Sequence, residues 1–142
     1  MTRTLALLAA LLASSSAIAQ SVYPPGAIPI SASASGTTGV VTATIAAQAS
    51  KTAVLCGFVY TGSNASSAQN GSVTVTGVVG GTMSFAYPTL AAGAAVPVTS
   101  PVDEAFLPCI PATSVNVAIT VNGPALGTGA PIATVTAWGF YQ

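Results

Sequence analysis

Residues 115–122 read Val-Asn-Val-Ala-Ile-Thr-Val-Asn, and this stretch decides the fold class. Val115, Val117, Ile119 and Val121 alternate with Asn116, Ala118, Thr120 and Asn122. Successive side chains of a β-strand point to opposite faces, so this period of two predicts one packed face and one wet face. Such a pattern is typical of an antiparallel outer strand. No segment of the chain shows a convincing helical period, so we predict an all-β protein.

The stretch Thr52–Tyr60 differs from residues 115–122 because it is apolar on both faces. Val54, Cys56 and Phe58 alternate with Ala53, Leu55 and Val59. A strand that is covered on both faces belongs in the interior of a sheet. We therefore predict that Thr52–Tyr60 is a central strand.

Other short β-prone runs continue from residue 38 to the C-terminus, separated by residues that favour turns. The turn signals are Asn70-Gly71, Gly80-Gly81, Asn122-Gly123-Pro124 and Gly127-Thr128-Gly129. The expected strands are Val40–Ala46, Thr52–Tyr60, Ser72–Val79, Thr82–Tyr87, Ala95–Thr99, Glu104–Leu107, Val115–Val121 and Ile132–Phe140. This pattern predicts an antiparallel two-sheet β-sandwich of about eight strands, and a jelly roll is one arrangement that it allows.

Residues 1–19 have the three parts of a cleavable secretory signal peptide. Arg3 supplies the positive start, Leu5–Ala13 form an apolar core, and Ala17-Ile18-Ala19 provide small residues before a cleavage site at Gln20. The apolar core is about half of the roughly 20 residues that span a bilayer. We therefore predict a secreted protein, in the periplasm, at the cell surface or outside the cell, without a membrane span after cleavage.

The predicted mature chain is almost free of charge. Charged residues make up 3% of the full chain, and it contains no histidine; ordinary globular proteins have about 25% charged residues. Residues 20–36 form an extended segment rich in Pro, Ser and Ala, and residues 37–142 form the predicted sandwich domain. With so little charge, copies of the protein repel one another weakly, and self-association is favoured.

Cys56 and Cys109 are the two cysteines of the chain. In an oxidising compartment, a single pair of this kind predicts a structural disulfide. Two buried thiols are the simplest alternative. Redox or metal chemistry is the least supported interpretation, because the pair lacks CxxC spacing, histidine and a neighbouring basic group.

The residue types of the chain give little support to an enzyme. Histidine, on which most acid–base and triad mechanisms depend, is absent. Asp103 and Glu104 are adjacent, so a strand would direct them to opposite faces, and they offer too few oxygen ligands for calcium. We predict no catalytic residue, cofactor or metal. Nucleic-acid binding is also not expected, because Lys51 is the one basic side chain of the mature protein.

Aromatic side chains are the best candidates for binding a ligand. Tyr60, Tyr87 and Tyr141 lie at or near the ends of expected strands, where a tyrosine can remain at the surface and hold a sugar ring. The bulkier aromatic residues are interpreted as core. They are Phe58, Phe85, Phe106 and Trp138.

Four segments resemble small, uncharacterised all-β proteins of phages and bacterial prophage regions: Lys51–Tyr60, Gly71–Gly77, Leu107–Ala112 and Ala137–Gln142. This resemblance covers most of the mature chain and implies a structural or virion-associated role. A weaker resemblance is to chaperone-usher pilins, which are exported sandwiches with a disulfide and a tyrosine beside the C-terminus. It implies that the N-terminal segment adds a strand to a neighbouring copy.

These observations together predict an exported, non-enzymatic structural or self-assembling surface protein. Self-association into a homo-oligomer or filament is the expected partnership. The alternatives are an adhesin-like module that binds a glycan or a cell-surface receptor, and a virion-associated structural protein.

Overall fold

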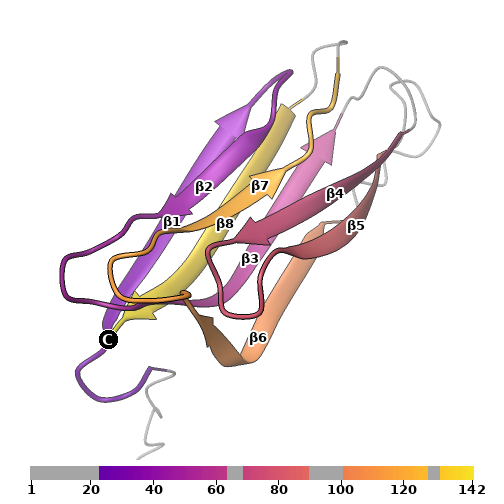
Figure 1. Cartoon of the computed structure of the whole chain (residues 1–142). Helices are drawn as coiled ribbons and strands as arrows, with labels where there is room; N and C mark the ends of the chain where they lie inside the picture. The colour runs from indigo at the N-terminus through magenta and orange to yellow at the C-terminus, as the bar shows by residue number, and fades with distance from the viewer. Residues whose placement is uncertain (1–22, 64–68, 90–100, 128–131) are drawn as a thin grey trace, which may run out of the picture.

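The protein folds as a β-sandwich of two four-stranded antiparallel sheets (Figure 1). The computed structural model describes residues 23–63, 69–89, 101–127 and 132–142. Sheet A has the strand order β1-β8-β3-β6, and sheet B has the order β2-β7-β4-β5. The strands are β1 (Ile28–Gly36), β2 (Val41–Ile45), β3 (Ala53–Ser63), β4 (Gln69–Thr76), β5 (Met83–Thr89), β6 (Val102–Pro111), β7 (Ile119–Gly123) and β8 (Ile132–Tyr141). The predicted all-β sandwich is confirmed.

The strand pairs have the connectivity of a jelly roll. β1 pairs with β8, β2 with β7, β3 with β6 and β4 with β5. This nested pairing is that of one long antiparallel hairpin, rolled so that its strands alternate between two sheets. Of the arrangements allowed by the sequence, the jelly roll is therefore the one that forms.

The core lies between the sheets and follows the alternation of each strand. In β2, Val41, Ala43 and Ile45 are buried while the residues between them are exposed. β7 alternates in the same way, with Ile119 and Val121 buried. Burial of these side chains removes apolar surface from water, which is the main favourable contribution to folding.

β3 is a central strand, as the sequence predicts, because it pairs with β8 on one side and β6 on the other. The predicted grouping of its side chains is partly wrong. Leu55 and Gly57 pair with the consecutive residues Gly139 and Trp138 of β8, so β3 has a one-residue β-bulge here, which reverses the facing of the residues after it. Consequently Phe58 joins the main core, whereas Val54 and Cys56 lie in a separate cluster on the outer face of sheet A.

β1 was not among the expected strands. The prolines at positions 24, 25 and 29 favoured an extended segment over a sheet strand, yet residues 28–36 pair with β8 along their whole length. An edge strand tolerates a proline such as Pro29, because one side of its backbone has no sheet partner. The sandwich therefore begins at Ile28 and not at residue 37.

The strand expected at Val115–Val121 is shorter than predicted and lies inside a sheet. β7 begins at Ile119 and runs between β2 and β4. Asn116 interrupts the expected strand, because it has a φ of 62° and its amide N–H donates to the Lys51 carbonyl. Its side-chain oxygen accepts a hydrogen bond from the backbone N–H of Ser50 at 2.7 Å. This turn leaves Val115 exposed to solvent.

Two predictions lie outside the described residues. They are the signal peptide, residues 1–19, and the strand at Ala95–Thr99. In the described part of the chain, no helix has the length and apolar character needed to cross a membrane.

Candidate functional site

The three candidate tyrosines lie in the core, so the prediction that they are at the surface is wrong. Tyr60, Tyr87 and Tyr141 retain 0%, 2% and 7% of their exposed area. Tyr60 and Phe58 are two residues apart in β3 and face the same side, as Tyr87 and Phe85 do in β5. Because Phe58 and Phe85 were already interpreted as core, this spacing of two residues could have predicted that Tyr60 and Tyr87 are buried.

The tyrosine hydroxyl groups join the two sheets. Tyr60 in sheet A donates to the Pro124 carbonyl after β7 at 3.1 Å. In the opposite direction, Tyr87 in sheet B donates to the Gly62 carbonyl in β3 at 2.8 Å. The rings of Tyr60 and Tyr87 meet edge to face, with centroids 4.7 Å apart. The pair thus supplies both packing and satisfied polar groups between the sheets.

Tyr141 makes the equivalent connection nearer to β1. Its hydroxyl donates to the Ala46 carbonyl, which follows β2, at 2.7 Å. The Tyr60 ring is accommodated because residue 123 is glycine: a Cβ there would overlap the ring. These three tyrosines therefore have a structural role in the described conformation, which no sequence motif had indicated.

Burial also changes the acidity of the tyrosines. Loss of hydration raises the pKa of Tyr60 from 10.0 to about 12, with a further contribution from neighbouring Tyr87. Burial raises the pKa of Tyr87 and that of Tyr141 as well. The cause is that an ionised phenolate is poorly solvated away from water. All three hydroxyls therefore stay protonated at physiological pH.

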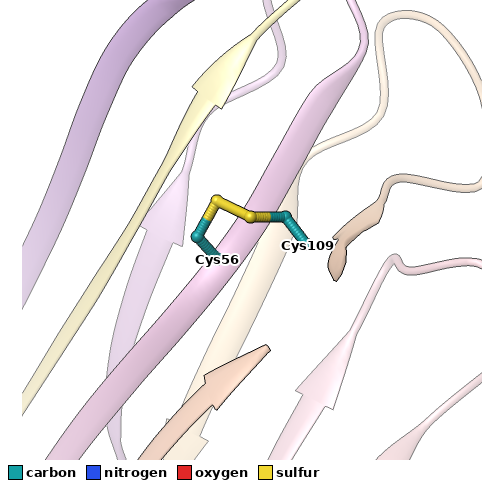
Figure 2. The surroundings of a disulfide bond; sticks show 2 residues. All are labelled: Cys56 and Cys109. Atoms are coloured by element: carbon teal, nitrogen blue, oxygen red, sulfur yellow. A yellow bond between two sulfur atoms is a disulfide. The ribbon is translucent and has the colours of Figure 1, made fainter. Parts of the chain in front are cut away.

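The predicted disulfide between Cys56 and Cys109 is present and joins β3 to β6 (Figure 2). The two Cα atoms are 4.3 Å apart, and the cysteines are 53 positions apart in the sequence. The bond lies where the β3–β6 register is interrupted, between the pairs Leu55–Ile110 and Gly57–Ala105. It therefore holds the edge strand β6 to the sheet at the point where the backbone pairing is weakest.

A small apolar cluster surrounds the disulfide on the outer face of sheet A. Val54, Cys56 and Phe140 are buried there, with Trp138 packed against them. Trp138, which the sequence predicts to be core, is partly buried in this second cluster and not in the cluster between the sheets. Tyr23 packs edge to face on Phe140, with ring centroids 5.4 Å apart. The segment before β1 therefore covers part of this outer face.

Beside this cluster lies an open groove of about 410 Å³. Its lining residues are Pro24, Val54, Leu107, Pro108, Cys109, Pro111, Phe140 and Gln142. Leu107 lies in the interrupted part of β6 and retains 97% of its exposed area. A concave apolar surface with an exposed leucine at its rim is able to bind an apolar or ring-shaped group.

The rest of the outer faces carries rows of uncharged hydroxyl groups. On sheet B, the strand register aligns Thr42, Asn122, Thr74 and Ser84 in one row, and Thr44, Thr120 and Thr76 in the next. Thr42 donates to the Asn122 side chain at 2.7 Å, and the hydroxyls of Thr76 and Thr120 are 2.6 Å apart. On sheet A, the Thr61 and Thr134 hydroxyls are 2.5 Å apart. These rows of polar side chains hydrate the outer faces of the sandwich without charged groups.

The charged side chains of the sandwich do not converge on one site. Asp103 and Glu104 face opposite sides of β6, as the sequence predicts, since they pair with Val59 and Phe58. Lys51 lies before β3, where its backbone holds the Asn116 turn. Among the described residues, no group of three or more His, Cys, Asp or Glu side chains is close enough to hold a metal ion.

Comparison with known proteins identifies no relative: no protein-family model, curated protein or solved structure matches the chain. The all-β, two-sheet architecture is thus established by the structure itself.

Proposed function

We propose that this protein is an exported, non-enzymatic structural protein that self-assembles at the cell surface. The observation that carries the proposal is the near absence of charge on a folded β-sandwich. Only Arg3, Lys51, Asp103 and Glu104 carry charged side chains, and Arg3 falls in the predicted signal peptide. Protein surfaces normally resist association through charge, so identical copies of this domain meet little electrostatic opposition.

The disulfide supports export. A bond between Cys56 and Cys109 is consistent with an oxidising, extracytoplasmic location. It also suits a structural protein outside the cell, because it limits the opening of an edge strand.

The test is the oligomeric state of the oxidised protein recovered from the periplasm or the medium. Light scattering and negative-stain electron microscopy should show oligomers or filaments whose formation depends on residues 20–36. A strict monomer over a wide range of protein concentration would exclude the proposal.

The apolar groove favours a second candidate function, which is binding of a glycan or a cell-surface receptor. Leu107 and Phe140 would supply the contact with an apolar face of the ligand. A glycan array probed with the protein and with Leu107→Ser tests this alternative. Specific binding that the substitution weakens would support it, and Val79→Ser is the matched control, since Val79 is also exposed but does not line the groove. A virion-associated structural role would share the assembly behaviour of the first proposal.

A further inference from the structure

One edge of the sandwich is open to further strand pairing. β1 is the terminal strand of sheet A and pairs only with β8 among the described residues. It is nine residues long, with no register shift and no charged side chain. In an antiparallel ladder, alternate residues direct their N–H and C=O groups away from the neighbouring strand. β1 therefore presents a row of backbone donors and acceptors on its outer side, in which Pro29 alone lacks an N–H donor.

The opposite edge of sheet A has the features that prevent such pairing. β6 contains Asp103, Glu104, Pro108 and Pro111, and its ladder with β3 is interrupted. Charges, prolines and bulges on an edge strand all oppose edge-to-edge association. The difference restricts strand addition on sheet A to the β1 side.

We propose that β1 pairs antiparallel with β1 of a second copy, which joins two four-stranded A sheets into one continuous sheet. This inference rests on the proposed function, and it identifies the surface through which assembly occurs. Pairing over the whole strand places a twofold axis at Ala32, the midpoint of Ile28–Gly36. A closed, twofold arrangement is the commonest form of homo-oligomer.

The sequence of β1 is complementary to itself in this register. Ile28, which retains 46% of its exposed area, would face Gly36 of the second copy, which has no side chain. Ile30 would face Ala34, so each larger residue meets a smaller one. Ile30, Ala32 and Ala34 already pack against the core of their own copy. Pairing would thus continue the apolar row between the sheets from one copy into the next.

The serine residues of β1 fit the same arrangement. Ser31, Ser33 and Ser35 are exposed on the outer face of sheet A. Ser31 of one copy would lie directly opposite Ser33 of the second, where the hydroxyls can bond to each other or to water. No charged side chain is brought near another, which makes a second copy a suitable partner for this strand. β2 is adjacent to β1 at this side and carries no charged side chain either (Figure 1).

The first test places a charge on each edge in turn. Ser33→Lys would bring two lysines together near the twofold axis, whereas Ala105→Lys puts the same charge on the exposed outer face of β6. Analytical ultracentrifugation should show that Ser33→Lys weakens self-association at least about tenfold, because like charges oppose association. Added salt should partly restore that association. Ala105→Lys should leave it unchanged.

The second test reports the register directly and does not depend on a lysine at the edge. Ser31→Cys protein mixed with Ser33→Cys protein should form a disulfide between copies, because opposed residues of an antiparallel pair lie within disulfide reach. A mixture of Ser33→Cys with Ala105→Cys should not.

The outcomes separate the interface from the function. Oligomers that resist Ser33→Lys and form no Ser31→Cys/Ser33→Cys cross-link would overturn the β1 interface and leave the assembly proposal standing. A wild-type protein that is monomeric at all concentrations would overturn both. Loss of association with Ser33→Lys, reversed by salt, together with the specific cross-link, would establish the interface.

Discussion

The two edge strands of sheet A, β1 and β6, have similar lengths of nine and ten residues but differ in sequence and in how they are held. β1 is regular and uncharged, and hydrogen bonds to β8 hold it in place. β6 is interrupted, carries both acidic side chains of the protein, and is tied to β3 by the disulfide. Irregular pairing makes an edge unattractive to other strands but also weakens it. The disulfide thus fastens β6 to β3 beside the interruption of their pairing, whereas β1 is held by a continuous ladder with β8.

Removal of the disulfide should have the largest effect on stability and should act through β6. The double variant Cys56→Ala/Cys109→Ala should lower the free energy of unfolding by about 4 kcal/mol, since the bond closes a long loop in the unfolded chain. Urea unfolding monitored by circular dichroism provides the measurement. Association through β1 should persist in the fraction that remains folded. A loss smaller than about 1 kcal/mol would mean that β6 is held well without the bond.

High pH should weaken the cross-sheet hydrogen bonds of the tyrosines, and the effect should be larger for Tyr60 than for Tyr141, which lies beside β1. Between pH 10 and 12, Tyr60 is ionised in the unfolded chain but neutral in the folded one, because its folded pKa is about 12. The unfolded state then holds fewer protons, so the free energy of unfolding falls as pH rises through this window. Each unit of pKa difference corresponds to about 1.4 kcal/mol.

The matched variants for this pH effect are Tyr60→Phe and Tyr141→Phe. Unfolding measured at several pH values should show that Tyr60→Phe removes more of the pH dependence than Tyr141→Phe. An equal effect of both substitutions would contradict the assignment of the larger pKa rise to the Tyr60 site.

Substitution of one glycine near each edge of sheet A tests how tightly that region is packed. Gly57 lies near β6 and Gly39 lies near β1, and alanine adds one methyl group at each position. In Gly57→Ala, the Cβ would lie 2.5 Å from the Glu104 carbonyl oxygen and against the Trp138 ring, where β3 meets β6. Overpacking of this kind costs about 1–3 kcal/mol. In Gly39→Ala, between β1 and β2, the Cβ meets no atom within 4 Å. The thermal unfolding temperature should therefore be lowered by Gly57→Ala alone, and a similar loss for Gly39→Ala would be evidence against this account.

The smallest expected effect is the loss of a single hydroxyl on each side. Tyr87→Phe removes the bond from β5 to the Gly62 carbonyl, and Tyr141→Phe removes the bond from β8 to the Ala46 carbonyl. Each should lower the free energy of unfolding, measured in urea, by about 1 kcal/mol, the usual contribution of one hydrogen bond. Equal losses would show that the sheets are joined as firmly at the open edge as at the protected one.

The sequence alone determined the local properties of the chain. Alternation in residues 115–122 and the apolar run at Thr52–Tyr60 were sufficient to predict an antiparallel sandwich, because strand phase depends on neighbouring residues. The pair Cys56–Cys109 could be predicted because no other cysteine competes for either partner.

The tertiary structure decided the features that depend on distant partners. The bulge after Leu55 separated Val54 and Cys56 from the face that Phe58 occupies, and this bulge is set by pairing with β8, the last strand of the chain to be described. The tyrosines became internal because carbonyl groups on the opposite sheet accept their hydrogen bonds. β1 became a strand because β8 offers it a complete ladder, although local propensity favoured an extended segment. Only the fold therefore shows which edge of sheet A is regular and free of charge, and which edge is interrupted and charged.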